Sequence, residues 1–399
     1  MRKLLLLLPV VLILSSCSRH NDSLVSLSSD AINGVVQIVN LPDEQPTPTA
    51  TPSPTPTPSP SPNITPAPAP GPYGSDPRTT GPEVRPTPSP STTPSPTPEA
   101  KKAPGPDKDP EDGEDPSKPQ GPELGTGFII APNLIVTNYH VIGGEKRHYV
   151  VYGHNDLKKY VGHLIAGDKD ADIAIMRIDE WDDFVTAINP PILHWGSSRN
   201  LQEGQPVWAI GHPYGLTWTL TDGIVSRTLR RGPGGTTSYF VQTNTSINPG
   251  NSGGPLFNTD GAIIGINTEI VGSKGYIGLS IPSDYASKVV EDLQHGGKIK
   301  VGIIGINMAA SKDQHHVAVG ALFTGSNSIA AGLLPNDVIL QIRTPKTNGW
   351  ETIKTPEALQ YETKLLSPGD IVDVYALRDG HQYLKITFQM ADPNKVDTK

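Results

Sequence analysis

The chain has 399 residues, 42 of them proline, one cysteine and a formal net charge of −8. This acidic balance argues against a nucleic-acid partner. Because no apolar run beyond the first fifteen residues is long enough to cross a bilayer, a polytopic membrane protein is also excluded.

Residues 1–17 predict an export signal, because a basic start is followed by the apolar stretch Leu4 to Leu14 and a Leu-Ser-Ser-Cys ending. This ending resembles the cleavage box of bacterial lipoproteins, which would make Cys17 the lipidated first residue of the mature chain. Ser18 then favours the outer membrane over the inner one. The alternative is an ordinary secretory signal in which Cys17 has no role. In the lipoprotein case the mature fold has no disulfide, and its stability comes from packing.

Residues 42–122 contain about two thirds of the prolines, together with many Thr and Ser residues. A segment with almost no large apolar side chain does not bury enough surface to offset its ordering entropy, so we predict a long disordered region. It is either a tether between the lipid and the folded part, or a loop inside the first domain. In the second case residues 24–41, which end in an apolar cluster, form the first strand of that domain.

Residues 123–297 alternate short β-type runs with turn signals. This pattern predicts an all-β barrel or sandwich. A helix is predicted at Asp284 to Gln294, where Ser283 could cap it and Gly296 and Gly297 would stop it. A second domain is predicted over residues 300–391, with mixed strands and a helix at Pro356 to Lys364.

The strongest chemical signal is the run NPGNSGGP, which places Ser252 between glycines. A nucleophilic serine needs a tight turn that exposes its hydroxyl and directs nearby backbone N–H groups at one point, and glycines permit the required backbone angles. Two partners lie upstream at strand boundaries, His140 in TNYHVI and Asp172 in DADIAIMRI. His, Asp and then Ser is the chain order of chymotrypsin-like enzymes. Together the three residues predict a catalytic triad, although each alone would be an ordinary packing or turn residue.

From Gly125 to its end the chain resembles the HtrA (Deg) serine proteases. TNYHVI, DADIAIMRI, AIGHPYG, SINPGNSGGPL and IGLSIP are similar, in the same order, to that family's TNxHVV, TDLAVLKI, AIGNPFG, AINPGNSGGPL and IGFAIP. The resemblance implies a mainly β fold, a chymotrypsin-like double β-barrel followed by a PDZ domain, and no cofactor. His212 stands where the family has Asn in GNPFG, and we predict a structural role for it at a turn. The remaining histidines show no metal-site spacing.

The resemblance also assigns roles. Ser252 would be the nucleophile, His140 the general base and then acid, and Asp172 the residue that orients His140. The N–H groups of Gly250 and Ser252 would form the oxyanion hole.

Three further positions bear on specificity. Ser246, six residues before the nucleophile, would form the floor of the primary pocket, and Ile277 and Leu279 would line its walls. Since no carboxylate lies at the floor, cleavage after Lys or Arg is not expected. The family prefers small aliphatic residues such as Val or Ala before the cut bond, and an apolar pocket of this kind discriminates loosely.

The predicted second domain carries a peptide-binding signal. Lys300, Val301, Gly302 and Ile303 resemble the PDZ loop whose N–H groups hold a chain terminus, and the strand that follows would receive the peptide as an added strand. Lys300 replaces a usual aromatic residue. The alternative is a PDZ-shaped spacer that binds no free terminus.

The resemblance favours the loop interpretation of residues 42–122, because GVVQIV resembles the family's AVVxI just before its GSGF strand. We therefore predict a periplasmic, lipid-anchored, ATP-independent serine endopeptidase. Its predicted partners are unfolded or exported proteins, peptide C-termini, the membrane, and two further copies in a homotrimer, with no nucleic acid. The alternative is a non-catalytic scaffold or chaperone that binds unfolded chains.

Overall fold

The computed structural model describes residues 25–41, 123–143, 148–216, 218–232, 238–271, 277–296 and 298–397. The predicted export signal with Cys17, and the proline-rich segment, lie outside these residues.

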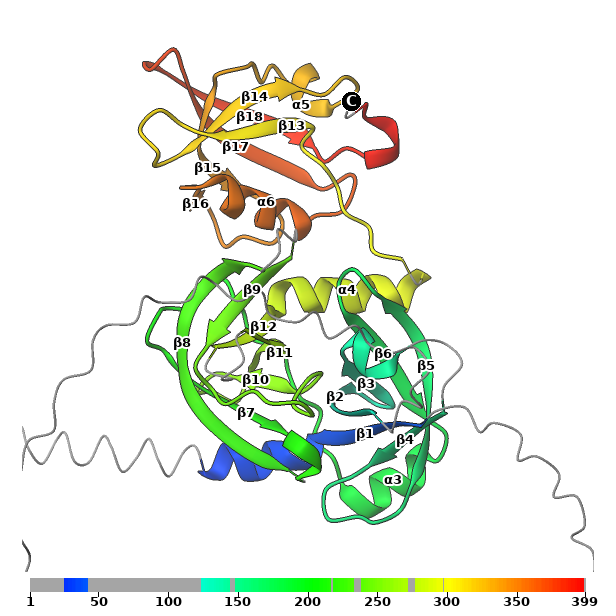
Figure 1. The fold of residues 1–399 in the computed structure, drawn as a ribbon. Helices are drawn as coiled ribbons and strands as arrows, with labels where there is room; N and C mark the ends of the chain where they lie inside the picture. The colour runs from blue at the N-terminus through cyan, green and yellow to red at the C-terminus, as the bar shows by residue number, and fades with distance from the viewer. Residues whose placement is uncertain are drawn as a thin grey trace, which may run out of the picture. The chain divides into compact units, whose positions relative to one another are not determined.

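The first barrel is closed and antiparallel, and its strands follow the order β1-β2-β3-β6-β5-β4 (Figure 1). Burial alternates along β4, as expected for a strand with one face inward, whereas β3 is buried along its whole length and β6 at all positions but one. The strands are β1 (Val35–Leu41), β2 (Glu123–Ala131), β3 (Leu134–Thr137), β4 (His148–Tyr152), β5 (Tyr160–Asp168) and β6 (Ile173–Ile178).

Strand β1 closes this barrel, although residues 42–122 separate it in sequence from every other strand. It pairs with β2 from Val35↔Phe128 to Asn40↔Glu123 and, along its other edge, with β4. Val35, Val36 and Ile38 are completely buried. The apolar cluster near the N-terminus is thus an inner strand with hydrogen-bonded neighbours on both sides.

The second barrel is also closed and antiparallel, in the order β10-β11-β12-β9-β8-β7. Two closed six-stranded barrels in succession confirm the predicted chymotrypsin-like architecture. The strands are β7 (Pro206–Gly211), β8 (Thr219–Arg231), β9 (Tyr239–Thr243), β10 (Pro255–Phe257), β11 (Ile263–Val271) and β12 (Ile277–Pro282).

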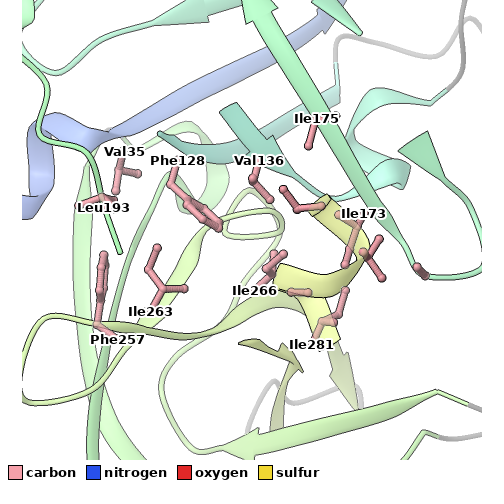
Figure 2. Packing of buried hydrophobic residues seen from close by; sticks show 14 of the residues in the cluster. Val35, Phe128, Val136, Ile173, Ile175, Leu193, Phe257, Ile263, Ile266 and Ile281 are labelled. Atoms are coloured by element: carbon pink, nitrogen blue, oxygen red, sulfur yellow. The ribbon is translucent and has the colours of Figure 1, made fainter. Parts of the chain in front are cut away.

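An apolar cluster joins the two barrels. Figure 2 shows Phe128 and Val136 of the first barrel beside Ile263, Ile266 and other residues of the second. These side chains are fully buried. Burial of each large aliphatic or aromatic side chain contributes about 1.5–3 kcal/mol, so this interface fixes how one barrel lies on the other.

Three helices of eight or more residues lie among the described elements: α3 (Trp181–Ile188), α4 (Ser283–Gly296) and α6 (Pro356–Lys364). The last two fall where the sequence placed them, and Thr355 Oγ1 caps α6 by accepting from Ala358 N–H. Helix α3 was not predicted. Within the described part of the chain, no helix combines the length and the apolar character required to cross a membrane.

Residues after α4 form a separate six-stranded antiparallel sheet, compatible with a PDZ domain. Its order is β13-β14-β15-β17-β18, with β16 added to β15. Ile339, Val374 and Phe388 belong to its own apolar core. The strands are β13 (Ile306–Ala310), β14 (Val317–Leu322), β15 (Val338–Arg343), β16 (Glu351–Thr352), β17 (Ile371–Arg378) and β18 (Gln382–Gln389).

The pairing of β1 predicts that the N-terminal segment stays bound after the chain is cut. If a site-specific protease cuts the chain near Pro90, the two fragments should separate in denaturing electrophoresis but elute together in native size-exclusion chromatography, because β1 is paired along both edges. In the control variant Ile38→Asp the N-terminal fragment should no longer elute with the C-terminal fragment, since a buried carboxylate without a partner costs several kcal/mol. Native separation of the wild-type fragments would contradict the prediction.

Candidate active site

His140 and Asp172 are held together by three hydrogen bonds in the first barrel. His140 lies in the short helix α2 (Tyr139–Ile142) directly after β3, and Asp172 lies just before the adjacent strand β6. Nδ1 of His140 is 2.9 Å from both carboxylate oxygens, and the backbone N–H of His140 donates to Oδ1 at 3.0 Å. A carboxylate only accepts, so Nδ1 carries the hydrogen and Nε2 keeps the lone pair that a general base needs.

Asp172 adopts the left-handed region, with φ +53°. Its own backbone C=O accepts from Asn138 Nδ2 at 2.8 Å. This conformation is uncommon for a residue other than glycine, and Asp and Asn are among those that tolerate it best. Contacts on both its side chain and its main chain therefore keep the carboxylate under the imidazole.

Thr268, in the second barrel, connects the three predicted triad residues. Its Oγ1 donates to Asp172 Oδ2 at 2.6 Å, and its backbone C=O accepts from Ser252 Oγ at 3.1 Å. The residue lies at a register shift in β11, where the pairing with β12 slips between Asn267 and Glu269. Sequence reasoning missed Thr268, because no local signal marks a β-bulge whose side chain faces another barrel.

The hydroxyl of Ser252 thus lies beside the same residue that holds Asp172, but it donates to the Thr268 carbonyl. Transfer of its proton to His140 requires that this hydrogen bond be exchanged for one to Nε2. A rotation about the side-chain bond of Ser252 moves the hydroxyl without moving the backbone, since staggered rotamers are the side chain's low-energy states.

The turn before Ser252 is fixed by hydrogen bonds on its carbonyl groups. Tyr214 N–H donates to Pro249 C=O at 2.8 Å, and Asn251 N–H donates to Asn248 C=O at 2.9 Å. Because a trans peptide holds its C=O and N–H on opposite sides, the N–H of Gly250 points away from Tyr214. Among the described residues, neither the N–H of Gly250 nor that of Ser252 donates to a backbone carbonyl group, so their assignment to an oxyanion hole stays a prediction.

Glycine is required at two positions of this turn. Gly250 has φ +104°, and a Cβ there would lie 2.2 Å from the backbone O of His212. Gly253 has φ +83°, and a Cβ there would lie 2.2 Å from the backbone O of Thr126. The backbone of the turn lies in contact with both barrels, so a residue with a Cβ does not fit at position 250 or 253.

His212 lies at a turn and is completely buried inside the fold. Burial lowers the pKa of its imidazole to about 3, with a smaller contribution from His154. Its Nδ1 is 3.0 Å from Thr126 Oγ1. The imidazole is therefore neutral at any pH near 7.

A cavity of about 470 Å³ lies beside the His140–Asp172 pair. Both polar and apolar side chains line it, and Ser246, Ile277 and Leu279 are not among them. Ser246 is exposed and its C=O accepts from Asn251 Nδ2 at 3.1 Å, whereas Leu279 is fully buried. Their role in specificity stays a prediction. The lining residues are His140, Lys169, Asp170, Ala171, Asp172, Ser238, Tyr239, Phe240, Thr268, Ile281 and Tyr285.

Three residues of the predicted peptide-binding loop donate their N–H groups to other parts of the chain. Gly302 N–H donates to Leu366 C=O at 2.8 Å, and Ile303 N–H donates to Ala391 C=O at 3.0 Å. Lys300 N–H donates to Asp292 at 3.0 Å. A carboxylate at this loop would have to replace these acceptors, so binding there needs a local rearrangement.

Comparisons with known proteins agree with this architecture. Residues 125–266 match the family described as trypsin-like peptidase domain. A "probable periplasmic serine endoprotease DegP-like" of Marinomonas sp. (strain MWYL1) is 38% identical over 294 residues, 70% of this chain and 59% of that protein. A protein of the same name from Halomonas elongata is 35% identical over 280 residues, 66% and 56% of the two chains. The chain therefore spans less than two thirds of the length of these curated relatives.

Among solved structures, the "HtrA-type protease AlgW with tripeptide" is 28% identical, with a TM-score of 0.50. The similarity covers 68% of this chain and 90% of that one.

The burial of His212 predicts a pH dependence of stability. The unfolded chain protonates this histidine below about pH 6.5, but the folded chain does so only near pH 3. The free energy of unfolding should therefore fall, as pH is lowered through this window, by about 1.4 kcal/mol per pH unit from this group alone. Urea unfolding between pH 4 and 6 should show a steeper acid slope in the wild-type protein than in His212→Asn. Equal slopes would contradict the buried neutral state.

Proposed function

Because this chain belongs to the HtrA (Deg) family of trypsin-like serine proteases, we propose that it is an ATP-independent serine endopeptidase that cleaves misfolded or exported proteins. The observation that carries the proposal is the hydrogen-bonded set His140–Asp172–Thr268–Ser252, assembled from both barrels.

The first half of the proposed reaction is acylation. Ser252 Oγ attacks the peptide carbonyl while Nε2 of His140 removes its proton, and Asp172 stabilises the imidazolium that results. The N–H groups of Gly250 and Ser252 hydrogen-bond to the oxyanion. One such donor is worth about 3 kcal/mol in the transition state.

The second half releases the products. The imidazolium of His140 protonates the leaving amine as the C–N bond breaks, which completes acylation. The same imidazole then deprotonates a water molecule that attacks the acyl-enzyme, and it returns this proton to Ser252 Oγ as the acyl–oxygen bond breaks. Thr268 Oγ1 keeps Asp172 oriented through both halves, because its hydrogen bond to Oδ2 leaves the other contacts of the carboxylate with His140 intact.

We place the enzyme in the periplasm, anchored by a lipid on Cys17, with the outer membrane favoured. The names of the similar proteins support the periplasmic part. The third sheet is proposed to be a PDZ domain that binds peptide C-termini. Strand β13 supports this role, because it ends the strand order of its sheet and could accept an added strand. A homotrimer is proposed from the family resemblance alone.

The competing function is a non-catalytic scaffold or chaperone, and a fluorophosphonate probe distinguishes the two. The probe should label the wild-type protein and leave Ser252→Ala unlabelled. Ser252→Ala should also lose hydrolysis of an unfolded protein by about 10⁶-fold in kcat. Absence of labelling in the wild type under every activating condition, or equal labelling of Ser252→Ala, would favour the binding protein.

Asp172→Asn should lower kcat by about 10⁴-fold, because an amide can donate to Nδ1 and so favour the wrong tautomer of His140. The matched control is Asp179→Asn. Asp179 accepts from His163 at 2.7 Å in an exposed pair, so it offers the same residue types outside the site. Steady-state hydrolysis of an unfolded protein measures both. Equal losses in the two variants would contradict the role of Asp172.

The specificity prediction is tested by mapping cleavage sites with mass spectrometry. Cuts should follow Val and Ala rather than Lys and Arg, because no carboxylate lies at the predicted pocket floor, Ser246. A difference of one methylene should change kcat/KM by about 10-fold to 200-fold at most. Preferred cleavage after basic residues would show that another group forms the floor.

A further inference from the structure

The side chain of Thr126 clamps the turn that carries the proposed oxyanion hole. Thr126 lies on β2 of the first barrel and is completely buried. Its N–H donates to Ser252 C=O at 2.9 Å, and its Oγ1 donates to Gly250 C=O at 2.6 Å. One residue of the first barrel thus holds two carbonyl groups of a turn that belongs to the second.

These contacts bear on the two proposed donors. The peptide group between residues 250 and 251 lies between the N–H of Gly250 and the N–H of Ser252 along the chain. Rotation of this peptide changes ψ of Gly250 and φ of Asn251, two of the angles that set how the neighbouring peptide units, which carry the two N–H groups, are oriented relative to each other. The hydrogen bond from Thr126 Oγ1 opposes that rotation, and glycine at 250, with its wide range of backbone angles, offers little resistance of its own.

His212 determines which way the Thr126 hydroxyl points. A hydroxyl has one hydrogen, and here it is donated to Gly250 C=O. The oxygen then accepts from His212 Nδ1 at 3.0 Å, so Nδ1 carries the ring hydrogen. If Nδ1 were an unprotonated acceptor, the hydroxyl could turn towards it and release Gly250.

The environment of His212 keeps its imidazole neutral. The ring packs edge-to-face on Trp218 with centroids 4.7 Å apart, and Trp218 Nε1 donates to Val35 C=O at 3.0 Å. The ring of His154 also packs edge-to-face on Trp218, with ring centroids 5.3 Å apart, and burial lowers the pKa of His154. The imidazole of His212 is desolvated and neutral. Its Nε2 has no hydrogen-bond partner among the described residues.

We propose that His212 is a positioning residue of the catalytic site. Through the chain His212 Nδ1–H to Thr126 Oγ1–H to Gly250 C=O, it holds the turn so that the N–H groups of Gly250 and Ser252 face the reacting carbonyl oxygen. This inference rests on the proposed protease function and assigns that site two residues, His212 and Thr126, that bind no substrate.

Five variants of the full-length chain test the hydrogen-bond chain. His212→Asn can place an amide N–H at the position of Nδ1, whereas His212→Gln, one methylene longer, reaches the position of Nε2. His212→Leu has no donor. Thr126→Ser keeps the hydroxyl, and Thr126→Val replaces it with a methyl group of similar size. His212→Asn and Thr126→Ser thus keep the hydrogen-bond chain. His212→Gln and Thr126→Val are the matched variants that break it.

The expected result is a loss in kcat rather than in KM, because the turn acts on the transition state. His212→Leu, His212→Gln and Thr126→Val should each lower kcat by about 10-fold to 100-fold, less than removal of a donor, with KM changed by no more than about 3-fold. His212→Asn and Thr126→Ser should stay within about 3-fold of the wild type in kcat. The substrate is an unfolded protein, and thermal melting confirms that each variant is folded.

A double variant tests whether the two residues act through one chain. The loss in kcat of His212→Leu with Thr126→Val should be close to the larger single loss, because either change alone already breaks the chain. Independent packing roles would instead give losses that multiply.

The inference is overturned if kcat of His212→Gln and Thr126→Val stays at the wild-type value, if His212→Asn loses as much as His212→Gln, or if the changes are confined to KM. If His212→Leu does not fold, His212→Gln and Thr126→Val decide alone. Failure of the proposed function is a different result, in which the wild-type protein neither hydrolyses the substrate nor reacts with a fluorophosphonate.

Discussion

The hydrogen bond from Thr268 Oγ1 to Asp172 Oδ2, 2.6 Å long, joins the two barrels at the place where chemistry is proposed. His140 and Asp172 come from the first barrel, whereas Ser252 and Thr268 come from the second. None of the four can act with the others until the barrels have packed. The site is therefore a property of the interface between barrels, and the apolar cluster around Phe128 and Ile266 is what sets its geometry.

The same constraint operates on the backbone of the nucleophile turn. Thr126 reaches from the first barrel to the carbonyl groups of Gly250 and Ser252 in the second. An active site tolerates little displacement, since a shift of about 1 Å in a reacting group can cost 10²-fold in rate. Two threonines that cross the interface, Thr126 and Thr268, thus connect the packing of the barrels to the positions of reacting atoms.

The sequence predicted the elements whose signals are local. Helix α6 has the predicted bounds, Pro356–Lys364, because a capping Thr355 and a proline at the first turn mark its start. The residue types of the triad, and the glycines around Ser252, could be read from motifs.

The interactions between barrels could not be predicted in this way. The hydroxyls of Thr126 and Thr268 meet their partners only after barrel closure, and Asp172 is far from Thr268 in sequence. His212 was placed at a turn, but its burial and its bond to Thr126 depend on the same long-range packing. Local patterns carry no information about which side chains face each other across an interface.

The entry of residues 42–122 between β1 and β2 has a consequence for how this chain can vary. Those strands are antiparallel neighbours, so their ends are held together by the barrel whatever connects them. Doubling the length of a flexible connection adds only about 0.6 kcal/mol of closure entropy. Insertions or deletions there can accumulate through evolution, or the segment can be engineered as a fusion point for another domain, while the candidate active site keeps its shape.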